Sequence, residues 1–360
     1  MRSGTFTTGG HRTSVSSRPG RLLAAAVAIA LSGGAVISHA AADDFYKGKE
    51  IRLIVSTAPG GAYDAYARLL APALADHLPG HPTIVVQNMP GAGGLKTANY
   101  IYAAAPRDGT VIAGTHSSVP TAPLMTPDAA KFDANKLSWI GSITSDPYVG
   151  YVWHTAPIKT LSDARTTELV VGGISVGTAG VDIAILARDM FDLKLKIVTG
   201  YKGSGDVKLA MEKGEVQGTF ANGWSSLKSA EPDWLRDRKI RIIVQHGFKK
   251  LPELPDVPRL IDFAKTDADR QVLFFALARQ TIAKPYFGPP EIPAERLTTL
   301  RRAFDAAIHD PKFVAAGTKA GVSLIDPMTG EELAALVRQL SETPPSVIRR
   351  INGMLKAFKK

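Results

Sequence analysis

Four glycine-rich loops are the segments of this chain best suited to bind a small molecule. They span residues 59–61, 90–94, 177–180 and 203–205. Glycine lets the main chain approach a ligand closely and adopt positive φ angles. Where such a loop enters a helix, unpaired N–H groups and the positive end of the helix dipole favour an anion. None of the four loops contains arginine. The pattern therefore predicts a carboxylate held mainly by main-chain amides.

Side chains beside these loops are further candidates for ligand contact. Asp64 falls in the first turn of a predicted helix, where a carboxylate also offsets the dipole, so a structural role stays open. Aromatic residues near loop ends have packing in the core as their alternative role. The predicted ligand-binding residues are Gly60, Gly61, Ala62, Tyr63, Asp64, Gly91, Ala92, Gly93, Gly94, Ser117, Gly177, Thr178, Ala179, Tyr201, Lys202, Asn222 and Trp224.

A serine hydrolase is the enzymatic alternative. Residues 173–177 read G-I-S-V-G, which satisfies the G-x-S-x-G motif with Ser175 as nucleophile, and His246 and His309 lie downstream as possible bases. The predicted helix begins only after residue 180, whereas a nucleophile elbow enters its helix directly. No H-G-G-G oxyanion segment precedes the motif. We therefore predict a binding protein rather than an enzyme.

The sequence contains no complete motif for a nucleotide cofactor or a metal ion. Lys96 occupies the third glycine position of a dinucleotide fingerprint in the second loop, and Thr178 stands where a P-loop needs lysine. The chain has no cysteine, which excludes thiolate metal sites. We predict no cofactor and no metal site.

The loops fall between predicted strands and helices in a recurring order. Strands at 51–56 and 83–87 each precede a glycine loop and a helix, at 62–78 and up to 105. The same order returns with strands at 168–172 and 195–198 and helices at 181–191 and 206–213. This alternation predicts parallel βαβ units, in which ligands bind beyond the carboxyl ends of the strands. The fold class is α/β, with two lobes that each consist of a sheet flanked by helices.

The chain divides into a leader and two lobes. We assign residues 1–42 to a signal peptide, 43–146 and 248–360 to the first lobe, and 147–247 to the second. Strands near 139–142 and 148–153 mark the first crossing between the lobes. Helices at 294–308, 330–340 and 345–358 are expected to pack on the first lobe.

The N-terminus predicts export. Four arginines precede residue 43 without any acidic residue, an apolar run covers 22–37, and small residues follow at 38–42. Cleavage after Ala40 or Ala42 fits this pattern; an uncleaved anchor helix is the alternative, although the run is short for a membrane span. The formal net charge is +10, but basic residues are scattered without interleaved aromatics, which disfavours nucleic-acid binding. We predict a periplasmic monomer.

Five motifs resemble a known family. Residues 58–64, A-P-G-G-A-Y-D, and 88–94, N-M-P-G-A-G-G, are similar to the first two loops of Bug-type solute-binding proteins of tripartite tricarboxylate transporters. Y-K-G-S-G at 201–205, G-E-V at 214–216 and L-P-D-V-P at 254–258 resemble further signatures of that family. The resemblance covers essentially the whole chain after the leader.

The resemblance implies a Venus flytrap fold of the type II periplasmic-binding-protein class that captures a di- or tricarboxylate, or an aromatic or amino-acid-like carboxylate. The ligand would pass to membrane permease subunits. In the family, amides of the first two loops hold one carboxylate and loops of the second lobe hold the rest. The chain departs from the family pattern in three places. Ala58 replaces the usual proline, the turn at Thr110 lacks the usual tyrosine, and the loop at 172–179 lacks the usual histidine. Sensing for a signalling partner stays open as an alternative to transport.

Overall fold

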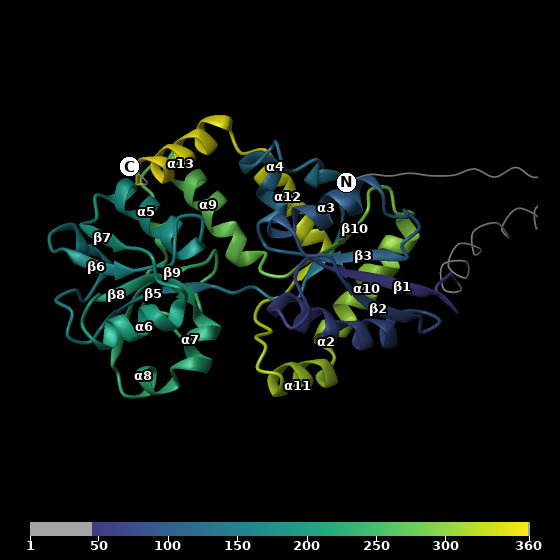
Figure 1. The fold of residues 1–360 in the computed structure, drawn as a ribbon, viewed down its shortest axis with the longest axis horizontal. Helices are drawn as coiled ribbons and strands as arrows, with labels where there is room; N and C mark the ends of the chain where they lie inside the picture. The colour runs from purple at the N-terminus through teal and green to yellow at the C-terminus, as the bar shows by residue number, and fades with distance from the viewer. Residues whose placement is uncertain (1–44, 359–360) are drawn as a thin grey trace, which may run out of the picture. The chain divides into compact units, whose positions relative to one another are not determined.

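The computed structural model describes residues 45–358, and two β-sheets organise this part of the chain (Figure 1). The first sheet has the strand order β11-β4-β10-β3-β1-β2. Its strands are β1 (Glu50–Val55), β2 (Thr83–Asn88), β3 (Val111–Gly114), β4 (Ser138–Ser142), β10 (Pro285–Gly288) and β11 (Met328–Thr329). Strands β2, β1 and β3 are parallel, whereas β10 is antiparallel to both β3 and β4. The predictions for residues 1–44, including the signal peptide, lie outside the described residues.

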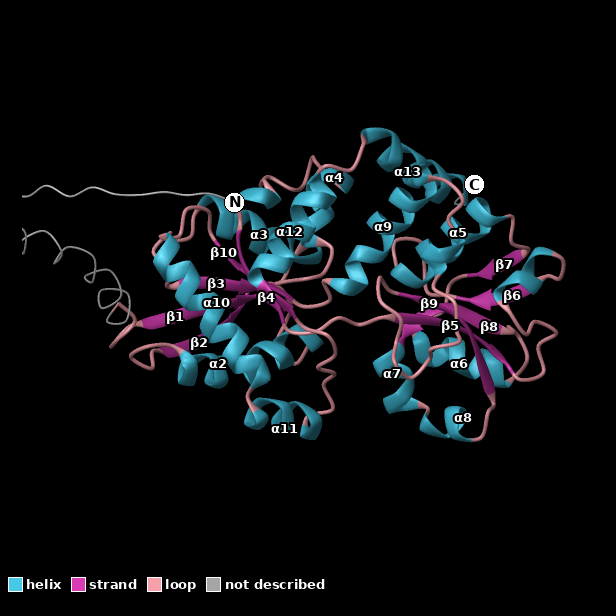
Figure 2. Ribbon diagram, turned by 180° about the vertical axis from the view of Figure 1, so that it is seen from behind, coloured by secondary structure: helices cyan, strands magenta, loops and turns pink. Residues whose placement is uncertain are grey.

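Helices cover both faces of the first sheet (Figure 2). Successive side chains of a strand point to opposite faces. Leu53 and Val55 of β1 accordingly pack with helices α2 (Ala62–His77) and α10 (Ala294–His309), while Ile54 packs with α3 (Leu95–Ala103) and α12 (Gly330–Ser341). A strand buried on both sides needs a continuous apolar run, which L-I-V at 53–55 of β1 provides.

The second sheet has the order β7-β6-β8-β5-β9. Its strands are β5 (Tyr148–Trp153), β6 (Leu169–Gly172), β7 (Leu195–Val198), β8 (Gly218–Gly223) and β9 (Ile240–His246). Helix α5 (Ala179–Phe191) packs on one face, and α6 (Ser204–Glu212), α7 (Trp224–Ala230) and α8 (Pro232–Arg236) contribute to the core on the other. Strand β5 runs antiparallel to both β8 and β9. Each sheet is therefore mixed, whereas the βαβ pattern predicted parallel pairing; β5 and β10 enter their sheets from the opposite direction.

The C-terminal helix differs from the expectation. Helix α13 (Pro345–Phe358) contacts α5 and α9 (Asp267–Thr281), not the first sheet (Figure 1). Its apolar residues Val347, Ile348 and Ile351 are buried in one cluster with Leu186 of α5 and Val272 of α9. Through α5 this apolar stripe also reaches the helix layer of the second sheet, a contact that the expected packing on the first lobe did not include. The lobe limits themselves stay a prediction.

Two short segments connect the sheets and lie side by side. Residues 143–147 run from β4 to β5, and 282–284 run from α9 to β10. The N–H of Asp146 donates to the carbonyl oxygen of Gln280 at 2.9 Å, and that of Ile143 donates to Lys284 O at 3.2 Å. The pair of segments therefore forms a hydrogen-bonded connection rather than two independent linkers.

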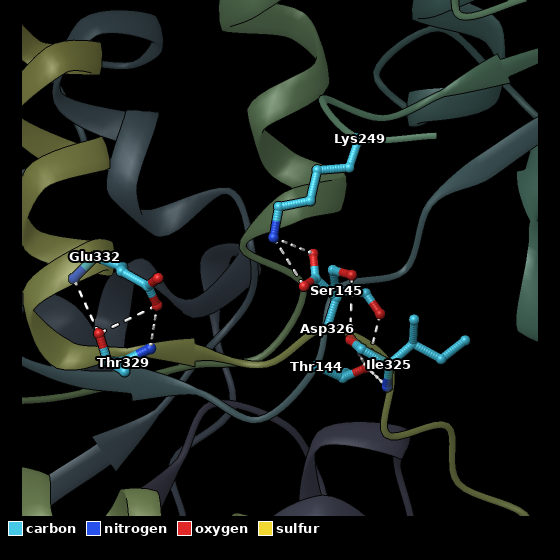
Figure 3. A network of polar contacts seen from close by, with 7 residues as sticks. All are labelled: Thr144, Ser145, Lys249, Ile325, Asp326, Thr329 and Glu332. Carbon is cyan, nitrogen blue, oxygen red and sulfur yellow. Dashed lines mark hydrogen bonds and ion pairs between the residues drawn. The ribbon is translucent and has the colours of Figure 1, made fainter. Parts of the chain in front are cut away.

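A third segment braces this connection (Figure 3). The N–H and the hydroxyl of Ser145 both donate to the carbonyl oxygen of Ile325, at 2.7 and 3.1 Å. Lys249 Nζ forms an exposed ion pair with Asp326 at 3.0 Å. Helix α12 begins just beyond, where Thr329 and Glu332 form a capping box. The segment before α12 is thereby fixed to the connection from both sides.

The remaining elements are short. They are α4 (Ala122–Met125), α11 (Pro311–Lys319), η1 (Ala92–Gly94), η2 (Val119–Thr121), η3 (Ala134–Lys136), η4 (Leu161–Arg165) and η5 (Leu260–Phe263). Within residues 45–358, no helix is both long enough and apolar enough to span a bilayer.

Candidate functional site

The first glycine loop joins β1 to α2 and is closed on itself. Gly60 has a φ of +81°, which favours glycine. Its N–H donates to Asp64 Oδ2 at 2.9 Å, while the N–H of Gly61 donates to the carbonyl oxygen of Ala58 at 3.2 Å. Helix α2 begins at Ala62, so its N-terminus opens at this loop.

Asp64 ties the first loop to the second. Its side chain is 4% exposed, and it accepts hydrogen bonds from Arg68 Nε at 2.9 Å and from Asn88 Nδ2 at 2.8 Å. Asn88 ends β2, directly before the second loop, and its Nδ2 also donates to Thr57 O. The hydrogen bond from Arg68 is the largest influence that lowers the pKa of Asp64 to about 2. This carboxylate is thus occupied in holding the two loops together, which is the structural role left open above.

The second loop requires a conformation that few residues tolerate. Gly91, Ala92, Gly93 and Gly94 all have positive φ, at 151°, 47°, 61° and 94°. The first three are exposed, so their main chain is accessible to a ligand. Gly94 is buried, and a Cβ there would lie 3.1 Å from Nδ1 of His116. Glycine at position 94 therefore permits the close approach of the loop to the end of β3.

Side chains beyond β3 complete this region. The N–H of Ser117 donates to Tyr63 Oη at 3.3 Å, and the rings of Tyr63 and His116 are 4.6 Å apart. Ser56 Oγ and His116 Nδ1 are hydrogen-bonded at 3.0 Å. The structure thus brings the predicted Tyr63, Ser117 and glycine loops together. His116 was missed, although its position after a strand's carboxyl end is the signal that would have found it.

A pocket of about 250 Å³ lies at the corresponding edge of the second sheet. Of the predicted residues, Thr178, Ala179 and Asn222 line it, together with Tyr148 and Tyr151, which the sequence analysis did not single out. Asn222 Nδ2 donates to Tyr151 Oη at 3.1 Å. The N-termini of α5 and α6 both reach this pocket through Ala179 and Ser204. Its walls combine main-chain amides with hydroxyl and amide side chains.

Four predicted residues do not line this pocket. Gly177 is exposed with a φ of +96°, and its N–H donates to Asp182 at 2.7 Å. Lys202 is also exposed, and its N–H donates to Asp206 at 3.1 Å. Tyr201 is half-buried against Gly172. Trp224 is 4% exposed in a core cluster, and its Nε1 donates to Glu253 at 2.7 Å. Core packing accounts for Trp224.

The hydrolase motif lacks the arrangement of an active site. Ser175 is exposed in the loop before α5, which begins at Ala179, so the serine does not enter a helix directly. His246 is fully buried and hydrogen-bonded to Phe220 O through Nε2, and burial lowers its pKa to about 4. His309 Nδ1 is hydrogen-bonded to Asp305 O. Within the described residues, no cluster of metal ligands is found.

Comparisons with known proteins identify a family of transport receptors. A family model described as the tripartite tricarboxylate transporter family receptor matches residues 66–352. A UPF0065 protein of Bordetella pertussis is 25% identical over 338 residues, which cover 92% of this chain and 97% of the relative.

Two solved structures support the same fold. A TctC solute-binding protein from Polaromonas superposes with a TM-score of 0.68 at 19% identity, covering 85% of this chain and 99% of that one. MatC of Rhodopseudomonas palustris with bound malate gives a TM-score of 0.52 at 22% identity, with 85% and 99% coverage.

Proposed function

Because the chain belongs to the tripartite tricarboxylate transporter receptor family, we propose that it captures a small carboxylate in the periplasm and delivers it to the membrane subunits of such a transporter. Receptors of this family are periplasmic solute-binding proteins. The specific ligand, the monomeric state and the partner subunits are parts of the proposal. Malate bound to MatC, which has a similar fold, is an example of the ligand class.

One observation carries the proposal most directly. The first two glycine loops are locked together by Asp64 and Asn88, while the main chain of 91–93 remains exposed. A rigid loop pair with accessible N–H groups needs little reorganisation to bind an oxyanion. Hydrogen bonds to a charged acceptor contribute roughly 1.5–3 kcal/mol each. The first carboxylate of the ligand is therefore assigned to the loops at 60–62 and 91–94.

The second sheet contributes the other part of the proposed site. Its 250 Å³ pocket is lined by Thr178, Asn222 and Tyr151, which supply hydroxyl and amide groups for the remainder of the ligand. Contacts from both lobes exist together only when the lobes close on the ligand. The division into lobes at 43–146 with 248–360 and at 147–247 belongs to this proposal.

Mass spectrometry of small molecules tests the proposal. The protein is purified from periplasm without refolding, denatured, and the released molecules are identified. We expect a small carboxylic acid near one equivalent, and this acid should raise the unfolding temperature of stripped protein. Release of a neutral ligand that restores the same stabilisation would contradict carboxylate capture.

A further inference from the structure

Two cationic side chains, Arg279 and Lys284, lie without an ion-pair partner at either end of the segment that connects α9 to β10. Neither takes part in any of the ion pairs found in residues 45–358. Arg279 Nε is buried and has no hydrogen-bond partner. Lys284 Nζ reaches only the carbonyl oxygen of its neighbour Ala283, at 3.5 Å. Both residues are half-buried, and a partly desolvated cation without a counter-charge is costly, so their retention needs an explanation.

Lys284 is directed toward residues of the candidate site. Its Nζ lies 4.5 Å from the centre of the Tyr63 ring and 5.2 Å from that of Tyr66. Tyr63 in turn contacts His116 and accepts the N–H of Ser117. The positive charges of Lys284 and Arg279 both add to the lowering of the pKa of His116, of which burial is the main cause. The two cations therefore act on the same region of the first sheet.

One carboxylate, Asp146, faces this region. It lies against Gly223, where a Cβ would approach Asp146 Oδ2 to 2.9 Å, and its Oδ1 is buried without a partner. Burial raises the pKa of Asp146, and the charge of Lys284 opposes that increase. Asp146 does not come within ion-pair distance of either cation. Even when Asp146 is ionised, two positive charges face one negative charge.

The charge of Arg279 also acts on a residue that lines the pocket of the second sheet. Tyr148 lines that pocket, and its pKa, raised by burial to about 12, is influenced by Arg279, Asp146 and Tyr63. The charges of Arg279 and Asp146 also influence the pKa of Tyr63. Lys284 thus lies over Tyr63 of α2, beside the loop pair, and the charge of Arg279 acts on both Tyr63 and Tyr148.

We propose that Arg279 and Lys284 bind a second anionic group of the ligand, so that this protein selects dicarboxylates over monocarboxylates. The assignment rests on the proposed function, because it needs the first carboxylate to occupy the glycine loops. A ligand carboxylate here supplies the counter-charge that the described residues do not provide. A monocarboxylate of equal length leaves both cations unpaired and desolvated, which disfavours its binding.

Calorimetric titration with matched acids tests this assignment. The probes are succinate, adipate and suberate, each paired with the straight-chain monoacid of the same carbon number. We expect at least one diacid to bind on the order of ten- to a hundredfold more tightly than its monoacid, as expected for a charged hydrogen-bonded pair. Lys284→Met keeps the apolar stem beside Tyr63 but removes the charge, so it should lower the affinity for the diacid toward that of the matched monoacid and thereby remove the preference.

The control variant is Lys213→Met, at an exposed lysine beyond α6, which should keep the preference intact. Thermal unfolding checks that each variant is folded; Arg279→Gln replaces Lys284→Met if the latter does not fold. A preference that survives in the charge-removing variant, or a wild-type protein that binds both acids of each pair equally, overturns the dicarboxylate assignment but leaves carboxylate capture standing. Failure of every acid in both series to bind also overturns the dicarboxylate assignment, whereas carboxylate capture itself is overturned only by the mass-spectrometry test above.

Discussion

Asp64 and Asn88 join two loops that lie more than twenty residues apart in the chain, through a 2.8 Å hydrogen bond from the amide to the carboxylate. The same carboxylate accepts the N–H of Gly60 and the Nε of Arg68. A single side chain therefore sets the distance between the two loops assigned to the first carboxylate. Its loss should affect both stability and ligand affinity.

We expect Asp64→Asn to lower the free energy of unfolding by about 1–3 kcal/mol, since it replaces a buried charged acceptor that has several donors. The pKa of Asp64 is depressed to about 2 from an ordinary 3.8. The stabilisation is thus complete above about pH 4 and is lost as the pH falls through 2. Urea unfolding at pH 7 and pH 2.5 measures this change. Asp76→Asn, at an exposed position in the same helix, is the control; an equal loss in both variants would contradict the prediction.

Gly93→Val should weaken binding far more than Lys96→Ala. Gly93 has a φ of +61° and open space beside it, so valine adds both backbone strain and bulk where the anion must approach. Lys96 is exposed, and removal of its screened charge should cost about 1 kcal/mol or less. Calorimetric titration with the acid recovered by mass spectrometry compares the variants, after circular dichroism has shown that both are folded. Normal binding by Gly93→Val with none by Lys96→Ala would exclude a carboxylate held by the main-chain amides of this loop.

Ligand should reduce the radius of gyration. Contacts from both lobes form only in a closed state, so binding shifts the population toward it. Small-angle X-ray scattering with and without saturating ligand measures the difference. The matched sample is protein mixed with a non-binding acid. A radius that stays constant at saturation favours a rigid single-lobe binder.

Protein recovered from periplasm should begin at Ala41 or Asp43. The apolar run at 22–37, followed by small residues, predicts cleavage there. N-terminal sequencing of the mature protein reads the site directly. Intact Met1 in a membrane fraction would instead support the anchor-helix alternative.

Ser175 should not react with a fluorophosphonate probe. In the described residues, His246 and His309 are hydrogen-bonded to main-chain carbonyl oxygens elsewhere, so no base activates the serine. Intact-protein mass spectrometry after incubation shows whether an adduct has formed. Ser175→Ala is the matched control, and an adduct that this variant lacks would revive the hydrolase hypothesis.

Local signals explain which elements could be predicted. The strand β7 and the helix α13 have the limits expected from their apolar patterns, and the second loop was recognised from its glycines. Helix α9 was missed because it packs both against α5 and beneath α13, so its buried residues do not form a single stripe. Strand β10 was missed because its sequence, P-Y-F-G, begins with proline and ends with glycine, which are turn and loop signals.

The candidate site was only partly predictable, because some of its members meet through long-range pairing. Lys284 lies over Tyr63, more than two hundred residues earlier in the chain, since β10 inserts between β3 and β4. No spacing rule in one sequence links two such positions. Trp224 illustrates the opposite error, because its place at a loop end suggested ligand contact whereas the structure buries it beside Glu253.

The hydrogen-bonded pair of segments at 143–147 and 280–284 has a mechanical consequence. The two segments run antiparallel, because Ile143 pairs with Lys284 and Asp146 with Gln280, and their hydrogen bonds restrict independent rotation of either segment. Under the proposed closure, the two sheets would then follow one reproducible path. Lys284 sits on one segment and Asp146 on the other. A ligand anion at Lys284 would therefore act on the connection between the two sheets itself.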